Sequence, residues 1–156
     1  MNKPVGLVKR DVRYKKQQHI GQGAFGVVYQ AFEVGQKAIG VLGKCVAVKQ
    51  MKSRESMGVP QDAYREMKIL KELSKLPNEN IVRLERAYRL ADPDGTSSLN
   101  LVYTYAEHDL AEIIRYHRAK SMPVDRKMIK SIMFQILQGV AFLHENWIMH
   151  RDIVSF

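Results

Sequence analysis

Three closely spaced glycines lie between two strand-like segments near the N-terminus. The segment reads Gly21-Gln22-Gly23-Ala24-Phe25-Gly26-Val27-Val28, the pattern G-x-G-x-x-G-x-V. Glycine lets the backbone approach phosphate groups with no side chain in between. In a dinucleotide-binding fold such glycines open a helix, but here they lead into Val27-Val28-Tyr29, which is typical of a strand. The pattern therefore indicates a glycine-rich hairpin that could cover a phosphate group. By itself, however, the pattern is a weak signal.

The order of the remaining segments predicts an α+β fold. Strands are expected within residues 14–32, on either side of the glycines, and over 44–51, 81–90 and 99–105. The segments 34–43 and 92–95 are rich in glycine or in Asp, Pro and Gly, which indicates loops. One helix is expected from Pro60 to Pro77, and helical spacing returns at 108–118 and from Asp125 onward. The chain therefore has a strand-rich part followed by a helical part.

Composition narrows the class of protein. The chain has 156 residues, of which 46% are hydrophobic and 26% charged, so it is expected to form about one globular domain. The single cysteine, Cys45, has no internal disulfide partner. No apolar run approaches the ~20 residues of a membrane span or the length of a signal-peptide core. We expect an intracellular protein that is neither secreted nor inserted in a membrane.

Positive charge is concentrated at the N-terminus. The net charge is +9, and residues 1–20 carry six bases and one acid. A basic arm can attract acidic or phosphate-rich partners, but most such arms are only solvated. Specific nucleic-acid binding is therefore the less favoured alternative.

A lysine and a glutamate form the next candidate feature. The segment Val46-Ala47-Val48-Lys49 is typical of a strand, whose period of two places Ala47 and Lys49 on one face. The small side chain of Ala47 leaves room for a flat base, and Lys49 supplies a cation for phosphate oxygens. Glu66 is the only charge on a helical stripe of Ala63, Ile69, Leu70 and Leu73. A carboxylate there needs a partner, and Lys49 is the natural one. The alternatives are a solvated lysine at a strand end and a glutamate at the rim of the stripe.

The residues Trp147-Ile148-Met149-His150-Arg151-Asp152 follow the long helical segment. Over residues 14–153 the chain resembles the eukaryotic-like protein kinases. The resemblance rests on the order of four features: a glycine-rich segment, a lysine on a strand, a glutamate on a helix and the motif His-Arg-Asp. The segment Gly58–Glu66 resembles the P-S-T-A-I-R-E helix with which cyclin-dependent kinases meet their cyclin. Within that family, Tyr105–Leu110, Ile113–Arg118 and His144–Trp147 resemble the Mediator-associated branch that partners cyclin C.

This resemblance implies a protein-kinase-like fold with a five-stranded antiparallel N-lobe sheet, one C-helix and the first helices of an incomplete C-lobe. The implied divisions are a basic arm at 1–13, the N-lobe and hinge at 14–106, and the start of the C-lobe at 107–156. The implied activity is transfer of the ATP γ-phosphate to serine or threonine of protein substrates. The implied partners are a cyclin C-like protein on the helix near residues 60–74 and the Mediator kinase module, and the implied location is the nucleus.

The resemblance also assigns roles to residues. Asp152 is the expected catalytic base, and Lys49, paired with Glu66, orients the α and β phosphates. Tyr103 is the expected gatekeeper, while Tyr105 and Ala106 form the hinge. Asp109 has two open alternatives, an approach to the ribose and a helix N-cap. The full set expected to bind ATP is Gly21, Gln22, Gly23, Ala24, Phe25, Gly26, Val28, Ala47, Lys49, Tyr103, Tyr105, Ala106 and Asp109.

The sequence departs from the family pattern in two places. Ala24 and Phe25 have no hydroxyl where the family is phosphorylated for inhibition. After Ile153 the family continues Lys-Pro-x-Asn, whereas Val154-Ser155-Phe156 follow here, and no Asp-Phe-Gly occurs. We therefore expect ATP and Mg²⁺ as family cofactors but no metal ligand in this chain, with His108, His117 and His144 as packing or capping groups.

These departures lead to three further expectations. The chain by itself should not transfer phosphate, because the positioning and charge-neutralising groups are missing. A splice form, an intron readthrough or a truncated gene model would explain the departure, and the helix from Asp125 to Glu145 would then expose apolar surface. The alternative function is an inactive short form that binds cyclin or ATP.

Overall fold

The computed structural model describes residues 13–23, 26–34, 43–53, 61–76, 78–91 and 97–153. Ala24 and Phe25, residues 35–42 of the first expected loop and residues 92–96 at the second lie outside the described residues. The chain divides into two compact units. Unit 1 contains Met1–Leu76 and Arg83–Tyr105, and unit 2 contains Pro77–Val82 and Ala106–Phe156. The domain bounds given by the sequence remain a prediction.

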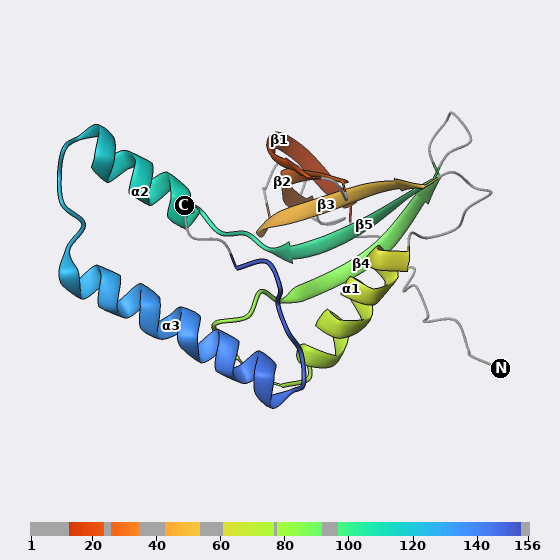
Figure 1. Cartoon of the computed structure of the whole chain (residues 1–156). Helices are drawn as coiled ribbons and strands as arrows, with labels where there is room; N and C mark the ends of the chain where they lie inside the picture. The colour runs from red at the N-terminus through yellow and green to blue at the C-terminus, as the bar shows by residue number, and fades with distance from the viewer. Residues whose placement is uncertain are drawn as a thin grey trace. The chain divides into compact units, whose positions relative to one another are not determined.

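Unit 1 contains a five-stranded antiparallel sheet (Figure 1). Its strands are β1 (Arg13–Gly23), β2 (Gly26–Val34), β3 (Cys45–Ser53), β4 (Leu84–Ala91) and β5 (Ser97–Thr104), in the order β1-β2-β3-β5-β4. The predicted fold class is confirmed. β4 begins at Leu84 and not at Ile81, because the chain turns just before it, where Asn80 N donates to Asn78 Oδ1 at 2.8 Å.

The register of β3 places the candidate site residues on one face of the sheet. Lys49 lies opposite Val28 on β2 and Leu101 on β5, while Ala47 lies opposite Tyr103. Directly paired residues share a face, and so do residues two apart on one strand. This face carries a core cluster of Met51, Ala63, Leu99, Leu101 and Tyr103, with Ala47, Met67, Leu70, Leu84 and Ala87 packed against it.

The other face of the sheet buries a second cluster. It consists of Ala31, Val46, Val48 and Val102, with Tyr14 and Tyr88 packed against it. The Tyr14 and Tyr88 rings are stacked at 5.6 Å between centroids. β3 is therefore buried on both faces, which explains its nearly continuous apolar sequence.

Helix α1 (Gln61–Leu73) supplies the layer over the first face. Ala63 and Leu73 are buried, and Met67 and Leu70 pack against the first cluster. Figure 1 shows α1 alongside β4 and β5. The apolar stripe predicted for this helix thus faces the sheet.

Unit 2 contains two helices, α2 (Leu110–Ala119) and α3 (Arg126–Glu145). A Cβ added at Gly139 would lie 3.1 Å from Asn80 O, so the glycine allows α3 to approach the segment around Asn80 closely. The sequence predicts an exposed apolar stripe on α3, and three of its residues, Ile129, Met133 and Leu137, are exposed, whereas Leu143 at the end of the stripe is buried. Phe134, which lies off the stripe, is also exposed. In the part of the chain that the structure describes, no helix combines the length and apolarity needed to cross a membrane.

The glycine hairpin yields a test of the backbone. Gly26 has φ +142°, and an added Cβ would lie 2.3 Å from Gln50 O, whereas nothing lies within 4 Å of a Cβ at Gly23. We expect Gly26→Ala to lower the free energy of unfolding by about 2 kcal/mol, because strained φ and steric overlap combine. Gly23→Ala is the matched control, with a change within about 0.5 kcal/mol. Urea unfolding measures both, and equal effects would show that the Gly26 backbone is not constrained as described.

Candidate active site

Lys49, Glu66 and Tyr103 meet on the α1 face of the sheet. Lys49 Nζ lies 2.7 Å from Glu66 Oε2, and the Tyr103 hydroxyl donates to Glu66 Oε1 at 2.7 Å. The pair of Lys49 and Glu66 expected from the sequence is thus present. Their side chains are 21% and 34% exposed, so the ion pair is shielded on the protein side and open to solvent on the other.

The surroundings of Tyr103 keep its hydroxyl protonated. Burial raises the pKa of Tyr103 above its ordinary value of 10.0, and the hydrogen bond to the Glu66 carboxylate raises it further. A protonated phenol can donate to one carboxylate oxygen while lysine donates to the other. Both oxygens of Glu66 are therefore bound, and the carboxylate has a defined orientation.

The other residues predicted for unit 1 lie on, or directly after, strands of the same sheet. Val28 and Ala47 are on the same face of the sheet as Lys49, in the register already described. Gly21 lies opposite Val28, and a Cβ at Gly21 would be 4.0 Å from Val28 Cβ. Gln22 and Gly23 end β1, and Tyr105 follows β5. Val28, Ala47 and Lys49 therefore share one face of the sheet, and Val28 lies on β2 close to the glycine hairpin.

Three predicted residues belong to unit 2: Ala106, Asp109 and Asp152. Asp109 is the N-cap of α2, because its side chain accepts from Glu112 N at 2.5 Å. Of the two alternatives left open by the sequence, the structure shows the cap. Asp152 is exposed, its N donates to His150 Nδ1 at 3.3 Å, and Arg151 before it has φ +64°.

The three histidines singled out in the sequence lie on or beside helices. His108 Nδ1 is 3.3 Å from Glu112 Oε2, His117 contacts the Tyr116 ring edge to face, and His144 lies in the last turn of α3. Among the described residues, no group of three or more His, Cys, Asp or Glu side chains could hold a metal ion.

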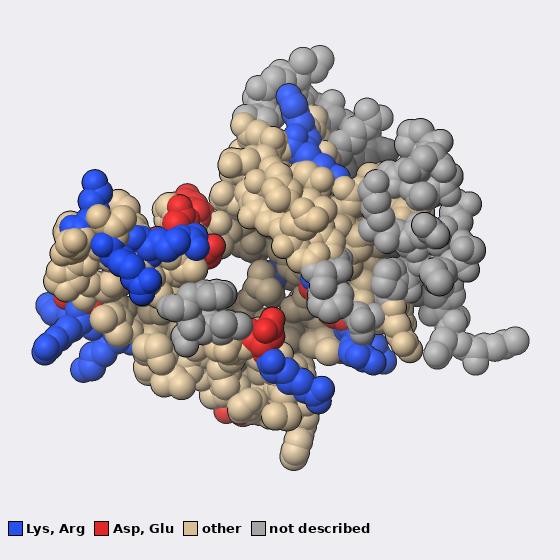
Figure 2. Space-filling view, turned by 45° about the horizontal axis from the view of Figure 1, so that its top comes forward, with Lys and Arg blue, Asp and Glu red and all other residues tan. Residues whose placement is uncertain are grey.

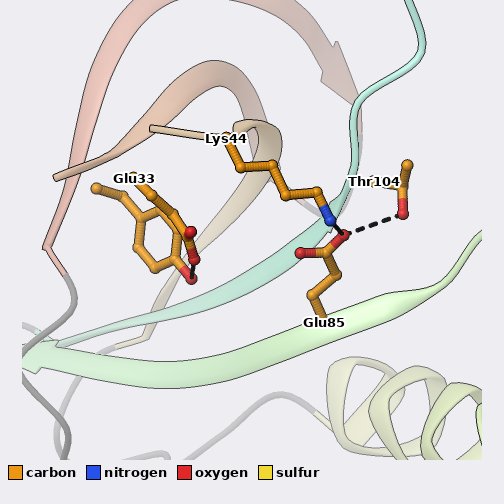
Figure 3. Close-up of polar contacts among 5 residues, drawn as sticks. Glu33, Lys44, Glu85 and Thr104 are labelled. Carbon is orange, nitrogen blue, oxygen red and sulfur yellow. Dashed lines mark hydrogen bonds and ion pairs between the residues drawn. The ribbon is translucent and has the colours of Figure 1, made fainter. Parts of the chain in front are cut away.

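A second polar cluster in unit 1 was not predicted. Lys44 forms an ion pair with Glu85 Oε1, which also accepts from Thr104 Oγ1 at 3.2 Å (Figure 3). These side chains line a hollow of about 490 Å³ together with Ser74, Arg83 and Leu84. Local sequence patterns carry no signal for it, because its members come together only through the pairing of β3, β4 and β5.

Known proteins are similar to this chain over most of its length. Residues 14–155 match the family described as "Protein kinase domain". The chain is 41% identical to the serine/threonine-protein kinase srb10 of Schizosaccharomyces pombe. The alignment of 145 residues covers 90% of the chain and 37% of srb10. It is 39% identical to the probable cyclin-dependent kinase 8 of Dictyostelium discoideum, covering 90% of the chain and 34% of that protein.

A plant relative extends the same pattern. The cyclin-dependent kinase E-1 of Arabidopsis thaliana is 37% identical over 144 residues, covering 90% of the chain and 28% of that protein. The resemblance identified from motifs is therefore confirmed. The chain spans about a third of the length of these relatives.

The raised pKa of Tyr103 predicts a dependence of stability on pH. The folded-state pKa lies above the unfolded value near 10, so the stabilisation is fully present below pH ~10 and is lost as pH rises further. Tyr103→Phe should cost about 1 kcal/mol of unfolding free energy at pH ~8, and the gap to wild type should narrow at pH ~11. Urea unfolding at the two pH values measures this, and a gap independent of pH would contradict it. Burial also raises the pKa of Tyr14, to about 12. Tyr14 is present in both proteins, so its ionisation lowers their free energies of unfolding equally at high pH.

Proposed function

The chain belongs to the protein kinase family, and we propose that the kinase domain containing it transfers the γ-phosphoryl group of ATP to serine or threonine side chains of proteins. The observation that carries this proposal is the ion pair of Lys49 and Glu66, at 2.7 Å, on the sheet face that also presents Val28 and Ala47. A lysine held by a helix glutamate is oriented for phosphate oxygens in protein kinases. The similarity to srb10 and to cyclin-dependent kinases supports serine and threonine as the residues that are phosphorylated.

Each proposed role follows from the chemistry of phosphoryl transfer. The substrate hydroxyl oxygen forms a bond to the γ-phosphorus while the bond to the β-γ bridging oxygen breaks, and the hydroxyl proton passes to Asp152. Lys49 binds α- and β-phosphate oxygens, and Gly21, Gly23 and Gly26 let the backbone cover the phosphates. Val28 and Ala47 contact the adenine, and Tyr105 and Ala106 bind its edge. We assign Mg²⁺ to no residue of this chain, because Val154-Ser155-Phe156 stand where the family pattern continues Lys-Pro-x-Asn and no Asp-Phe-Gly occurs.

We also propose that α1 is the contact for a cyclin. Tyr64 on α1 has 46% of its surface exposed, while Ala63 beside it is buried against the sheet. A cyclin on the exposed side of α1 would control the placement of Glu66, and therefore of Lys49. Two relatives are named as cyclin-dependent kinases, which supports a cyclin of some kind as the partner. A cyclin C-like partner, the Mediator kinase module and a nuclear location rest on the motif resemblance.

A second function, binding without phosphoryl transfer, is favoured by two observations. Lys49, Glu66 and Tyr103 all belong to unit 1 and are already in contact there. Residues 1–156 contain no Asp-Phe-Gly motif. We therefore expect the 156-residue chain to bind ATP and cyclin without transferring phosphate.

Calorimetry on residues 1–156 tests the nucleotide site. We expect saturable ATP binding that Lys49→Met weakens by about tenfold or more, because charge-assisted hydrogen bonds to phosphate are lost. Lys44→Met is the matched control, since Lys44 precedes the same strand and pairs with Glu85. Equal losses in the two variants, or no ATP binding by a folded chain, would refute the nucleotide site.

Cyclin capture tests the second contact. With recombinant cyclin C as the probe, Tyr64→Ala should weaken binding by about tenfold, because exposed tyrosines frequently dominate interfaces. Tyr116→Ala on α2 is the control, since Tyr116 is also exposed, at 58%. Unchanged affinity for Tyr64→Ala, or an equal loss for Tyr116→Ala, would show that α1 is not the contact.

A further inference from the structure

Six exposed basic side chains lie close together in the sequence of unit 2, at the end of α2, in the connection after it and at the start of α3. They are Arg115, Arg118, Lys120, Arg126, Lys127 and Lys130, named here the basic patch. Figure 2 shows Lys and Arg gathered over the end of the molecule on the left, where α2 and α3 are connected in Figure 1. Asp125 is the only acid between Arg115 and Lys130.

The basic patch is not neutralised within the described part of the chain. None of its six side chains forms an ion pair with another described residue. By contrast, Lys44, Lys49 and Lys75 of unit 1 each pair with a glutamate. Asp125, the N-cap of α3, makes no side-chain capping hydrogen bond. The positive charge of the patch is therefore available to a partner.

The stability of α3 does not explain the position of these bases. The first turn of α3 contains no acidic residue and begins with Arg126 and Lys127. Cations at the start of a helix oppose the helix dipole, and neighbouring like charges repel each other. Arg126 and Lys127 are therefore placed unfavourably in the free chain, and a bound anionic partner would offset this. Arg118, by contrast, lies in the last turn of α2, where a cation is favourable.

The backbone between the helices holds the patch in a defined conformation. Met122 N donates to His117 O at 3.0 Å, and Ser121 N donates to Arg118 O at 3.1 Å. With Ser121 at φ +51°, these two bonds form a Schellman motif, which fixes the chain after the helix. Two apolar side chains are exposed beside the bases, Tyr116 at 58% and Met122 at 54%. The surface therefore combines positive charge with apolar contact area.

We propose that the basic patch is a docking surface for an acidic polypeptide segment that carries apolar side chains among its carboxylates. Charge complementarity selects an anionic partner and speeds the encounter. Met122 favours a polypeptide over a nucleic acid, because a thioether side chain adapts to apolar side chains and adds nothing to a phosphate contact. This goes beyond the proposed function: a kinase would gain a contact for its protein partners outside the residues that bind ATP.

Fluorescence anisotropy on residues 1–156, with no nucleotide present, tests the docking surface. The probes are a labelled peptide of alternating Glu and Leu and a labelled single-stranded oligonucleotide. We expect the peptide to bind more tightly than the oligonucleotide, with an affinity that falls as salt rises. Reversal of two charges, Arg126→Glu with Lys127→Glu, should weaken peptide binding by about tenfold. This variant places acids in the first turn of α3, so it should fold at least as well as the wild type.

Two further variants make the result specific. Lys68→Glu with Lys71→Glu on α1 changes the net charge equally and should alter peptide binding by less than about twofold. Arg115→Gln with Arg118→Gln, at the end of α2, should weaken binding without reversing any charge. Equal losses in the α1 and α3 variants would attribute binding to net charge and overturn the proposal. Tighter binding of the oligonucleotide would overturn it in favour of a nucleic acid. Because no nucleotide is used, neither outcome bears on the ATP site.

Discussion

The carboxylate of Glu66 is the group on which the arrangement of unit 1 most depends. Apolar packing of α1 on the sheet is not directional, so Ala63, Met67 and Leu70 would tolerate small rotations of the helix. A partly buried carboxylate tolerates few, because each of its oxygens needs a donor. Lys49 comes from β3 and Tyr103 from β5, so satisfying Glu66 aligns the helix with two strands at once. The same contacts give Lys49 a defined direction, and this links the packing of unit 1 to its proposed chemistry.

Much of this arrangement follows from sequence by local arguments. A period of two places Ala47 and Lys49 on one face, and a single charge on an apolar helical stripe requires a partner. The hydroxyl of Tyr103 was missed as the second donor to Glu66. Its direction depends on the register of β5 against β3, which pairs Tyr103 with Ala47. Register is a property of two distant segments, and no local pattern within either one determines it.

The same reason explains the other differences between sequence and structure. Lys44, Glu85 and Thr104 form a cluster only because β3, β5 and β4 are neighbours in that order. For Asp109 the sequence supports both a cap and a ligand contact, and the local hydrogen bond to Glu112 N identifies the cap. The beginning of β4 was placed too early, because Ile81 and Val82 are β-branched residues that follow a turn and do not pair. Composition identifies residues that favour a strand, but hydrogen bonding decides where the ladder begins.

Whether each basic side chain is paired with an acid says more about this chain than its net charge does. The net charge of +9 draws attention to the N-terminal residues, where bases form a dense run. The basic patch is less evident in the sequence, because its members are spread over two helices and a connection. Three lysines of unit 1 are matched by glutamates from a helix or a strand. Ion pairs of this kind contribute little unless they are shielded, so selection for stability alone would not distinguish paired from unpaired bases. The distinction becomes meaningful at Arg126 and Lys127, which also oppose the dipole of α3, because the free chain then carries an unfavourable interaction that a bound anionic partner would offset.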